Sequence, residues 1–285
     1  MAFPNICHVI GMFRTSLLPI AFSMVLCASA FSQTESPIQS PASPFGLDIV
    51  APVQLAGSDE ASATFQSEVL PDILKLANQS LSEKNAPGNF NSIALDPANL
   101  VLAQDATVRV YFLNEGAGYS NSLGISTTDG GPLAPDAALI FPNASSSTGF
   151  GGTGTAIRSS TNPLAPGDFV DLGKFSAGTS LDFFLIADGA NGGKTFFSTD
   201  VSLNRDGIVH AVSLAPDGSA YLIIGFEDLL NGGDKDYNDV LIAVEIGKVN
   251  VQTLAGLGAP EPTLAMGAIL AFGLLACGTR RRLPQ

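Results

Sequence analysis

Short apolar runs separated by turn residues recur along most of the chain, and they predict strands. In residues 107–113, Val108, Val110 and Phe112 occupy every second position, as on a strand with one buried face. Comparable runs occupy residues 100–102, 122–126, 138–141, 168–172, 181–187, 195–199, 209–214, 221–226 and 240–244. About ten strands without intervening helices predict a mainly β fold, an antiparallel β-sandwich of jelly-roll type.

One stretch before the β region, residues 58–84, follows a helical period instead. Ser58 can cap a helix whose first turn carries two acidic residues. Apolar residues then recur at helical spacing, at Phe65, Val69, Ile73, Leu74, Ala77 and Leu81. Pro71 interrupts this pattern, so we expect a short helical segment in two pieces, the second beginning at that proline.

The runs at residues 221–226 and 240–244 flank a loop that is crowded with carboxylates. Asn231-Gly232-Gly233 tolerates positive φ and predicts a turn, so the two runs read as a hairpin. An antiparallel return brings together the six oxygen-bearing side chains at the two ends of the loop, Glu227, Asp228, Asp234, Asp236, Asn238 and Asp239. Such groups repel one another unless a cation lies among them.

Calcium is the cation that this set of side chains favours. Asp234, Asp236 and Asn238 alternate as in the opening of calcium loops, and their ligands are hard oxygens, whereas zinc prefers His or Cys. The helix-loop-helix calcium motif is excluded for two reasons. Asp239 stands where the motif needs glycine, and Glu245, which would be its last ligand, lies about 20 Å from Asp239 if residues 240–244 form a strand. The prediction is a Ca²⁺ site closed by Glu227 or Asp228. A solvated acidic loop whose side chains cap turns is the alternative.

Three segments together resemble a known family. The runs GFEDL…GGDKDYNDVLIAVEIG, LDFFLIADGANGG and VRVYFLNEGAGYSNSLG are similar to the domain of unknown function family numbered 4114, which occurs in exported bacterial proteins. The resemblance covers residues 94–247. That family has no established activity, so the resemblance implies an architecture and an exported context, and the calcium prediction rests on the residues alone.

The first 30 residues have the pattern of a signal peptide. Arg14 precedes an apolar run at residues 17–28, and Ala28-Ser29-Ala30 is a small-residue cleavage site, so we expect export. Met12 is an alternative start, since the residues from there onward have the proportions of a signal peptide by themselves. Lipid attachment at Cys27 is excluded, because the large residue Leu26 precedes it.

The last segment, residues 260–285, resembles the PEP-CTERM sorting signal. Pro260-Glu261-Pro262 precedes an uncharged run at residues 263–279, and Arg280-Arg281-Arg282 follows it. This run is just long enough for a transmembrane helix, and the arginines favour a cytoplasmic end. The resemblance implies recognition by an exosortase, a membrane transpeptidase, followed by cleavage near the motif and release or transfer to the cell surface. A permanent single-pass anchor is the alternative.

These segments define the predicted domain organisation. A signal peptide at residues 1–30 is followed by a linker at 31–57, the helical segment at 58–84 and a β-sandwich domain at 90–248, and a second linker at 249–259 precedes the sorting signal. All three cysteines lie in the two terminal segments, so the folded part contains no disulfide.

Charge and composition exclude several functions. The net charge is −13, which argues against a nucleic-acid partner. His210 is the only histidine beyond the signal peptide, so a zinc or Ser-His-Asp site would depend on it alone, and a structural strand histidine is the simpler interpretation. The glycine-rich residues 149–154 lack the helix that a dinucleotide-binding motif needs, and Asp188 stands where a phosphate loop ending at Thr195 requires glycine.

Two classes of function fit these observations. The first is a non-catalytic protein of the cell surface or extracellular matrix, stabilised by calcium and active in adhesion or in association with exopolysaccharide and biofilm. The second is an extracellular hydrolase, a glycosidase that uses a pair of the carboxylates. The chain has no Trp and only four Tyr, whereas glycosidases usually line their clefts with aromatic residues, so the first class is favoured.

Overall fold

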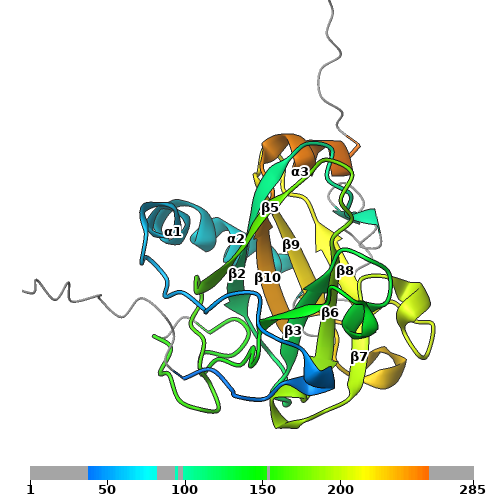
Figure 1. The fold of residues 1–285 in the computed structure, drawn as a ribbon. Helices are drawn as coiled ribbons and strands as arrows, with labels where there is room; N and C mark the ends of the chain where they lie inside the picture. Colours follow the sequence, from blue (N-terminus) through cyan, green and yellow to red (C-terminus); the bar gives the residue numbers. More distant parts are fainter. Residues whose placement is uncertain (1–37, 82–93, 96–98, 153–154, 257–285) are drawn as a thin grey trace, which may run out of the picture. The chain divides into compact units, whose positions relative to one another are not determined.

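The computed structural model describes residues 38–81, 94–95, 99–152 and 155–256, which all belong to the compact unit Gln33–Gln285. In this part of the chain, strands form two antiparallel sheets (Figure 1). The first sheet has six strands in the order β1-β8-β9-β10-β2-β5, and the second has four in the order β4-β3-β6-β7. The prediction of a mainly β fold with two antiparallel sheets is confirmed.

The elements have the following bounds. The strands are β1 Ala94–Leu95, β2 Ala106–Asn114, β3 Ser122–Ser126, β4 Ala138–Phe141, β5 Phe169–Phe175, β6 Asp182–Ala187, β7 Thr195–Ser198, β8 Ala211–Leu214, β9 Tyr221–Phe226 and β10 Val240–Glu245. Short helical turns are η1 Pro44–Gly46, η4 Gly131–Leu133, η5 Gly189–Asn191, η6 Val201–Leu203 and η7 Leu230–Gly232.

The main core lies between the two sheets and uses the alternate residues that the sequence predicts. On β2, Val108, Val110 and Phe112 are fully buried in it. On the other face of the same strand, Tyr111 and Leu113 are equally buried, in a second cluster that they share with the helical segment. The strand therefore buries both of its faces, because helices cover the side that would otherwise meet water.

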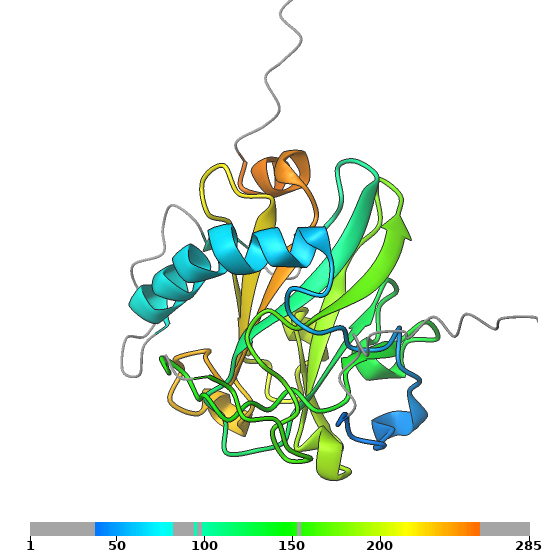
Figure 2. The ribbon, with the colours of Figure 1, turned by 90° about the vertical axis from the view of Figure 1, so that its left-hand side faces the viewer.

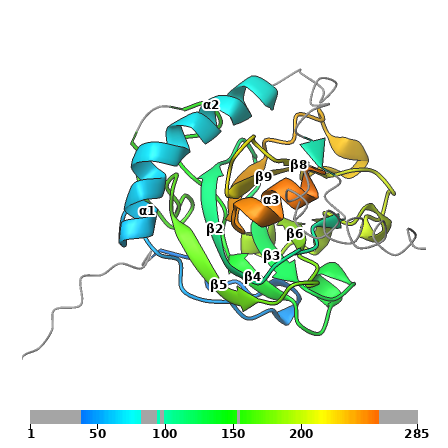
Figure 3. The ribbon, with the colours of Figure 1, turned by 90° about the horizontal axis from the view of Figure 1, so that it is seen from above.

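The helical segment consists of two α-helices joined by a π-helical turn, and the second helix begins at Leu70, one residue before the predicted start at Pro71. α1 (Glu60–Thr64), η2 (Phe65–Val69) and α2 (Leu70–Ser80) follow one another directly across the outer side of the first sheet (Figures 2 and 3). Because Pro71 has no N–H to donate, the turn before it widens, and the backbone N–H of Leu70 donates to the carbonyl of Phe65.

Asp59, rather than the predicted Ser58, caps this helix and also joins it to the sheet. Its carboxylate accepts from the backbone N–H of Ser62 at 2.7 Å, and the Ser62 hydroxyl accepts from the Asp59 N–H in return. The same carboxylate pairs with Arg109 of β2 at 2.8 Å, and Arg109 pairs with Asp171 of β5 at 2.6 Å. The guanidinium thus holds the start of the helix against two strands.

Parts of the two segments expected to be linkers pack against the sheets. Ile49 forms a bridge with β4 and Gln54 one with β5, while Val53 is only 4% exposed in the core. After β10, α3 (Lys248–Leu254) buries Val251 in the same core. The scattered apolar residues of the Pro- and Ser-rich segment at residues 31–57 are sufficient for packing against the sheets. Composition alone predicted a linker there.

The structure differs from the predicted strands at two places. Residues 100–102 form one bridge, between Val101 and Ser180, instead of a strand, while the unpredicted β1 pairs with β8. The predicted signal peptide at residues 1–30 and the predicted sorting signal with its transmembrane helix at 260–285 lie outside the described residues. Within the described residues, no helix combines the length and the hydropathy that a membrane span requires.

Candidate metal centre

The predicted hairpin is present, and its pairing brings the two ends of the carboxylate loop together. β9 and β10 pair antiparallel, from Phe226 opposite Val240 to Tyr221 opposite Glu245. The residues that follow β9 and those that precede β10 therefore meet at one end of the first sheet. Glu245 lies at the other end of β10, next to Arg109 of β2, as its exclusion from the site requires.

The loop backbone is bent by residues in the left-handed region. Asn231 (φ 67°), Lys235 (φ 61°) and Tyr237 (φ 56°) all adopt positive φ, which is uncommon for Lys and Tyr. At Gly233 a Cβ would lie 1.9 Å from the Oε1 atom of Glu227, so the packing leaves room only for glycine. These bends prevent the segment from extending as a strand and turn it towards Glu227.

Glu227 is the shared member of two groups of carboxylates. One group contains Glu227, Asp234 and Asp236, and the other contains Glu227, Asp228 and Asp239. In each group one oxygen per residue lies within 4.8 Å of the others, which is close enough to hold a metal ion. Glu227, Asp228 and Asp236 are buried, Asp239 is partly buried and Asp234 is exposed.

Hydrogen bonds hold some of these carboxylates in place. The backbone N–H of Asp228 donates to Oδ2 of Asp239 at 2.7 Å, across the neck of the hairpin. Asn238 donates through its amide nitrogen to Oδ2 of Asp236 at 2.6 Å and to the carbonyl of Leu81 at 3.2 Å. Asn238 thus turns its amide nitrogen, and not its oxygen, towards the acidic group, and in this arrangement it supports Asp236.

The pKa values of the carboxylates show how unfavourable their negative charges are here. Burial, followed by the charge of Asp239, raises the pKa of Glu227 to about 8. Burial, followed by the charge of Asp228, raises the pKa of Asp239 to about 7. Burial also raises the pKa of Asp228 and of Asp236. Within the described residues no Lys or Arg pairs with this group, so protons or a cation must offset the charge.

Two polar residues outside the hairpin complete the surroundings, and the sequence analysis missed them as site residues. Glu115, which follows β2 and is 7% exposed, has its pKa raised to about 7 by burial, with Asp228 contributing. Asn121 donates through its amide nitrogen to Oδ2 of Asp228 at 2.7 Å, and its oxygen accepts from the Asp188 backbone N–H at 3.0 Å. The available signal was the polar run that follows a buried strand at residues 114–122.

His210 is a buried support of this loop. Its ring stacks on Phe197 with 3.9 Å between centroids, and Nδ1 lies 3.2 Å from the Glu227 carbonyl oxygen. Nε2 lies 3.0 Å from Asp206, and the same Asp206 oxygen accepts from the Asn231 N–H at 2.7 Å. The Glu227 carbonyl thus contacts His210 directly, and the Asn231 N–H is bound to Asp206, which His210 also contacts.

Comparison with known proteins gives one match. The model of the family described as Domain of unknown function (DUF4114) matches residues 175–247, from the end of β5 to just beyond β10, and includes the complete carboxylate loop. No curated protein and no solved structure matches the chain. The predicted resemblance is therefore confirmed for residues 175–247, the stretch that carries the candidate metal centre.

Proposed function

We propose that this protein is an exported, non-catalytic protein of the cell surface or extracellular matrix, whose β-sandwich binds calcium at the β9–β10 loop. The observation that carries the proposal is the position of Glu227. This carboxylate is 1% exposed, belongs to both acidic groups and has no Lys or Arg partner among the described residues. A buried, crowded carboxylate of this kind is best explained by a cation that the folded protein binds.

The ligand chemistry supports calcium over other metals. The acidic groups contain only oxygen donors, whereas zinc and copper sites usually include His or Cys. Magnesium demands octahedral geometry at about 2.1 Å, while calcium accepts six to eight oxygens in flexible arrangements, which suits a curved loop. Glu227, Asp234 and Asp236 would hold the ion with Asp228 or Asp239 nearby. Extracellular calcium modules commonly bind at about 10⁻⁴ to 10⁻³ M.

A thermal unfolding experiment tests this proposal. At ten times the dissociation constant, calcium stabilises the folded state by about 1.4 kcal/mol, which corresponds to a rise in Tm of about 3 to 6 °C. Asp236→Asn should abolish most of that rise while leaving the metal-free protein equally or more stable. Asp129→Asn changes an exposed aspartate elsewhere and should keep the full rise. No rise for the wild type at millimolar calcium would reduce the loop to a solvated turn.

Export and surface location are supported by the two terminal segments. Residues 1–30 have the pattern of a signal peptide, and the motifs at Pro260-Glu261-Pro262 and Arg280-Arg281-Arg282 resemble an exosortase signal. Transient anchorage in the inner membrane, cleavage and transfer to the surface would place the domain among exopolysaccharide and neighbouring cells. Adhesion or exopolysaccharide association follows from that location and from the acidic charge.

The glycosidase alternative has less support. In a glycosidase, the two catalytic carboxyl groups lie about 5 to 9 Å apart, on either side of the bond that is cleaved. Here at least three carboxylates crowd one point, with oxygens within 4.8 Å of one another. This arrangement suits a shared cation better than an acid and a base that work on opposite sides of a substrate.

A further inference from the structure

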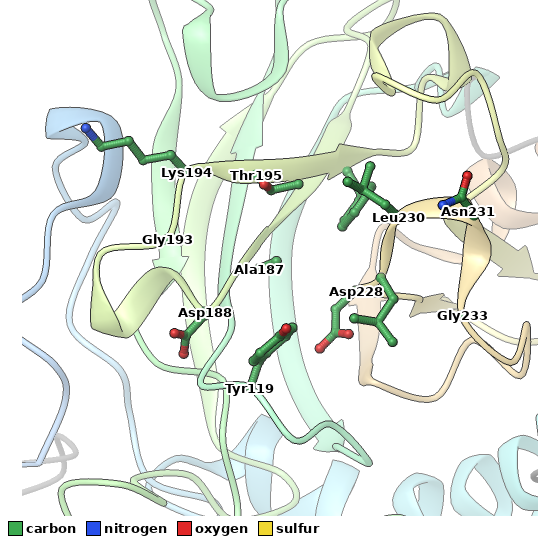
Figure 4. A pocket seen from close by; sticks show the side chains of 12 residues that line it. Tyr119, Ala187, Asp188, Gly193, Lys194, Thr195, Asp228, Leu230, Asn231 and Gly233 are labelled. Carbon is green, nitrogen blue, oxygen red and sulfur yellow. The ribbon is translucent and has the colours of Figure 1, made fainter.

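A cavity of about 530 Å³ lies beside the metal centre, between the β6–β7 turn and the β9–β10 loop (Figure 4). Asp188 lines it from the β6–β7 side, while Asp228, Leu230 and Asn231 line it from the loop, and Tyr119 stands between them. This volume falls within the range of about 300 to 1,000 Å³ that is usual for small-molecule sites. Asp228, which lines the cavity, also belongs to the metal centre.

Exposed apolar side chains gather at this cavity. Tyr119 is 45% exposed, Leu229 45% and Leu230 42%, and all three line it. They are three of the nine large hydrophobic side chains that are exposed among the described residues. Single exposed apolar residues need no explanation, but a group of them around a concave, partly polar opening points to a ligand with an apolar face.

The Asp188 carboxylate and the backbone of Asn231 are held in place before any ligand arrives. Oδ1 of Asp188 accepts from the Ser120 N–H at 3.2 Å and from the Asn191 amide at 2.7 Å, and Asp188 itself has φ 51°. On the opposite side, the backbone N–H of Asn231 is bound to Asp206. Fixed groups lose little conformational entropy on binding, which is a property of built recognition sites.

The charge of the cavity restricts the class of ligand. Asp188 and Asp228 stand around the same opening in Figure 4, while Lys194 extends away from them. Two carboxylates repel an anionic ligand. A cation in the metal centre offsets the charge of Asp228, which leaves one carboxylate acceptor, amide groups and an aromatic ring. Those groups match a neutral molecule that has several hydroxyl donors and an apolar C–H face.

We propose that this cavity binds a neutral hexose unit of a polysaccharide, with Asp188 and Asn231 bound to its hydroxyl groups and Tyr119 covering its apolar face. The inference rests on the proposed function, because calcium would fix Asp228 in the wall of the cavity. Saccharide binding should therefore require calcium. The proposal names a site and a ligand class for the exopolysaccharide association. It can fail while the calcium proposal holds, so an experiment can distinguish the two failures.

Affinity electrophoresis through gels that contain dextran, mannan or galactan, with calcium or with chelator, tests the site. Calcium is used at about 1 mM, the largest dissociation constant commonly found for extracellular calcium modules. At least one neutral polysaccharide should retard the wild type in calcium and none in chelator. Tyr119→Ala and Asp188→Asn should each weaken retardation about tenfold, and Tyr119→Phe, which keeps the ring, should not. Leu133→Ala, at a side chain 71% exposed elsewhere, is the matched control and should behave as wild type.

Each variant is also tested for its calcium-dependent rise in Tm. An unchanged rise with lost retardation supports the saccharide site. A wild type that shows the rise but is retarded by none of the three polysaccharides overturns the saccharide proposal and leaves the calcium proposal intact. Binding of an arginine-rich peptide, abolished by Asp188→Asn, with no polysaccharide bound, overturns it in favour of a cationic partner. Absence of the rise in wild type overturns the calcium proposal itself.

Discussion

The metal-free protein should lose stability as the pH rises from 5 to 8, and calcium should remove most of that loss. Glu227 and Asp239 have pKa values raised to about 8 and about 7 because both are buried among other carboxylates. In the unfolded chain they titrate at their ordinary values of 4.5 and 3.8. Between these limits the folded protein binds more protons than the unfolded chain, so its free energy of unfolding falls as the pH rises.

The magnitude follows from the size of the shift. One pKa unit corresponds to about 1.4 kcal/mol, so the shift of Glu227 alone represents on the order of 5 kcal/mol between pH 4.5 and 8. The contributions of Glu227 and Asp239 are not additive, because each charge raises the cost of the others. Glu115 acts in the same direction, since its pKa is raised to about 7. A bound cation replaces these protons, so calcium should bind more tightly at pH 8 than at pH 5.5 and release protons on binding.

Thermal unfolding at pH 5.5 and 8, with chelator and with calcium, measures both effects. Calcium is used at about 10 mM, ten times the largest dissociation constant expected for such a site. The metal-free Tm should be lower at pH 8, and the rise caused by calcium should be larger there. Calorimetric titration in two buffers of different ionisation enthalpy counts the protons released near pH 7. A metal-free Tm that increases from pH 5.5 to 8, or a calcium titration without proton release, would refute the reasoning.

Three further predictions concern other parts of the chain. Arg109→Met should destabilise the protein by about 1 to 3 kcal/mol in urea unfolding, because it removes two ion pairs from a side chain only 13% exposed; Asp59→Asn, which keeps the helix cap, should cost less. The Arg109 contact lowers the pKa of Asp59 to about 2, so this contribution is full above pH 3.8 and disappears as the pH falls towards 2. Gly233→Ala should abolish the calcium-dependent rise in Tm, since its Cβ would displace Glu227, whereas Gly218→Ala, with positive φ but open space around it, should cost only about 1 kcal/mol and keep that rise. Intact-mass measurement of protein from the cell surface should find residues 1–30 absent and a new C-terminus near Pro262; retained terminal arginines would indicate a permanent anchor.

The strands could be predicted because their signal is local. Val108, Val110 and Phe112 alternate in the sequence and face the core between the sheets, and the hairpin of β9 and β10 was visible in its two apolar runs. The sequence did not show what covers the other face of a strand. Tyr111 and Leu113 lie on the face that a simple sandwich would expose, and they are buried because η2 and α2 cover them. That cover depends on contacts between residues far apart in the chain.

The same distinction applies to the site. The carboxylates of one hairpin lie close in sequence, so the meeting of the two sets could be predicted from the turn, whereas the central place of Glu227 in both groups could not. Asn238 could not be assigned from its place in the alternating pattern, because its amide orientation is set by Asp236 and by the distant Leu81 carbonyl. Glu115 and Asn121 reach the site from the connection between β2 and β3, and no local spacing relates them to the hairpin.

Asn121 gives the two proposed ligands a physical connection. Its amide nitrogen binds Asp228 of the metal centre, and its amide oxygen binds the backbone N–H of Asp188 on the other side of the cavity. A cation that fixes Asp228 thereby restrains Asn121 and, through it, the β6–β7 turn that carries Asp188. Coupling of this kind is reciprocal: whatever factor calcium adds to the affinity for a saccharide, the saccharide must add to the affinity for calcium. A surface protein built this way would hold its polysaccharide only where extracellular calcium is sufficient, and Asn121, which would touch neither ligand directly, would set how strongly the two depend on each other.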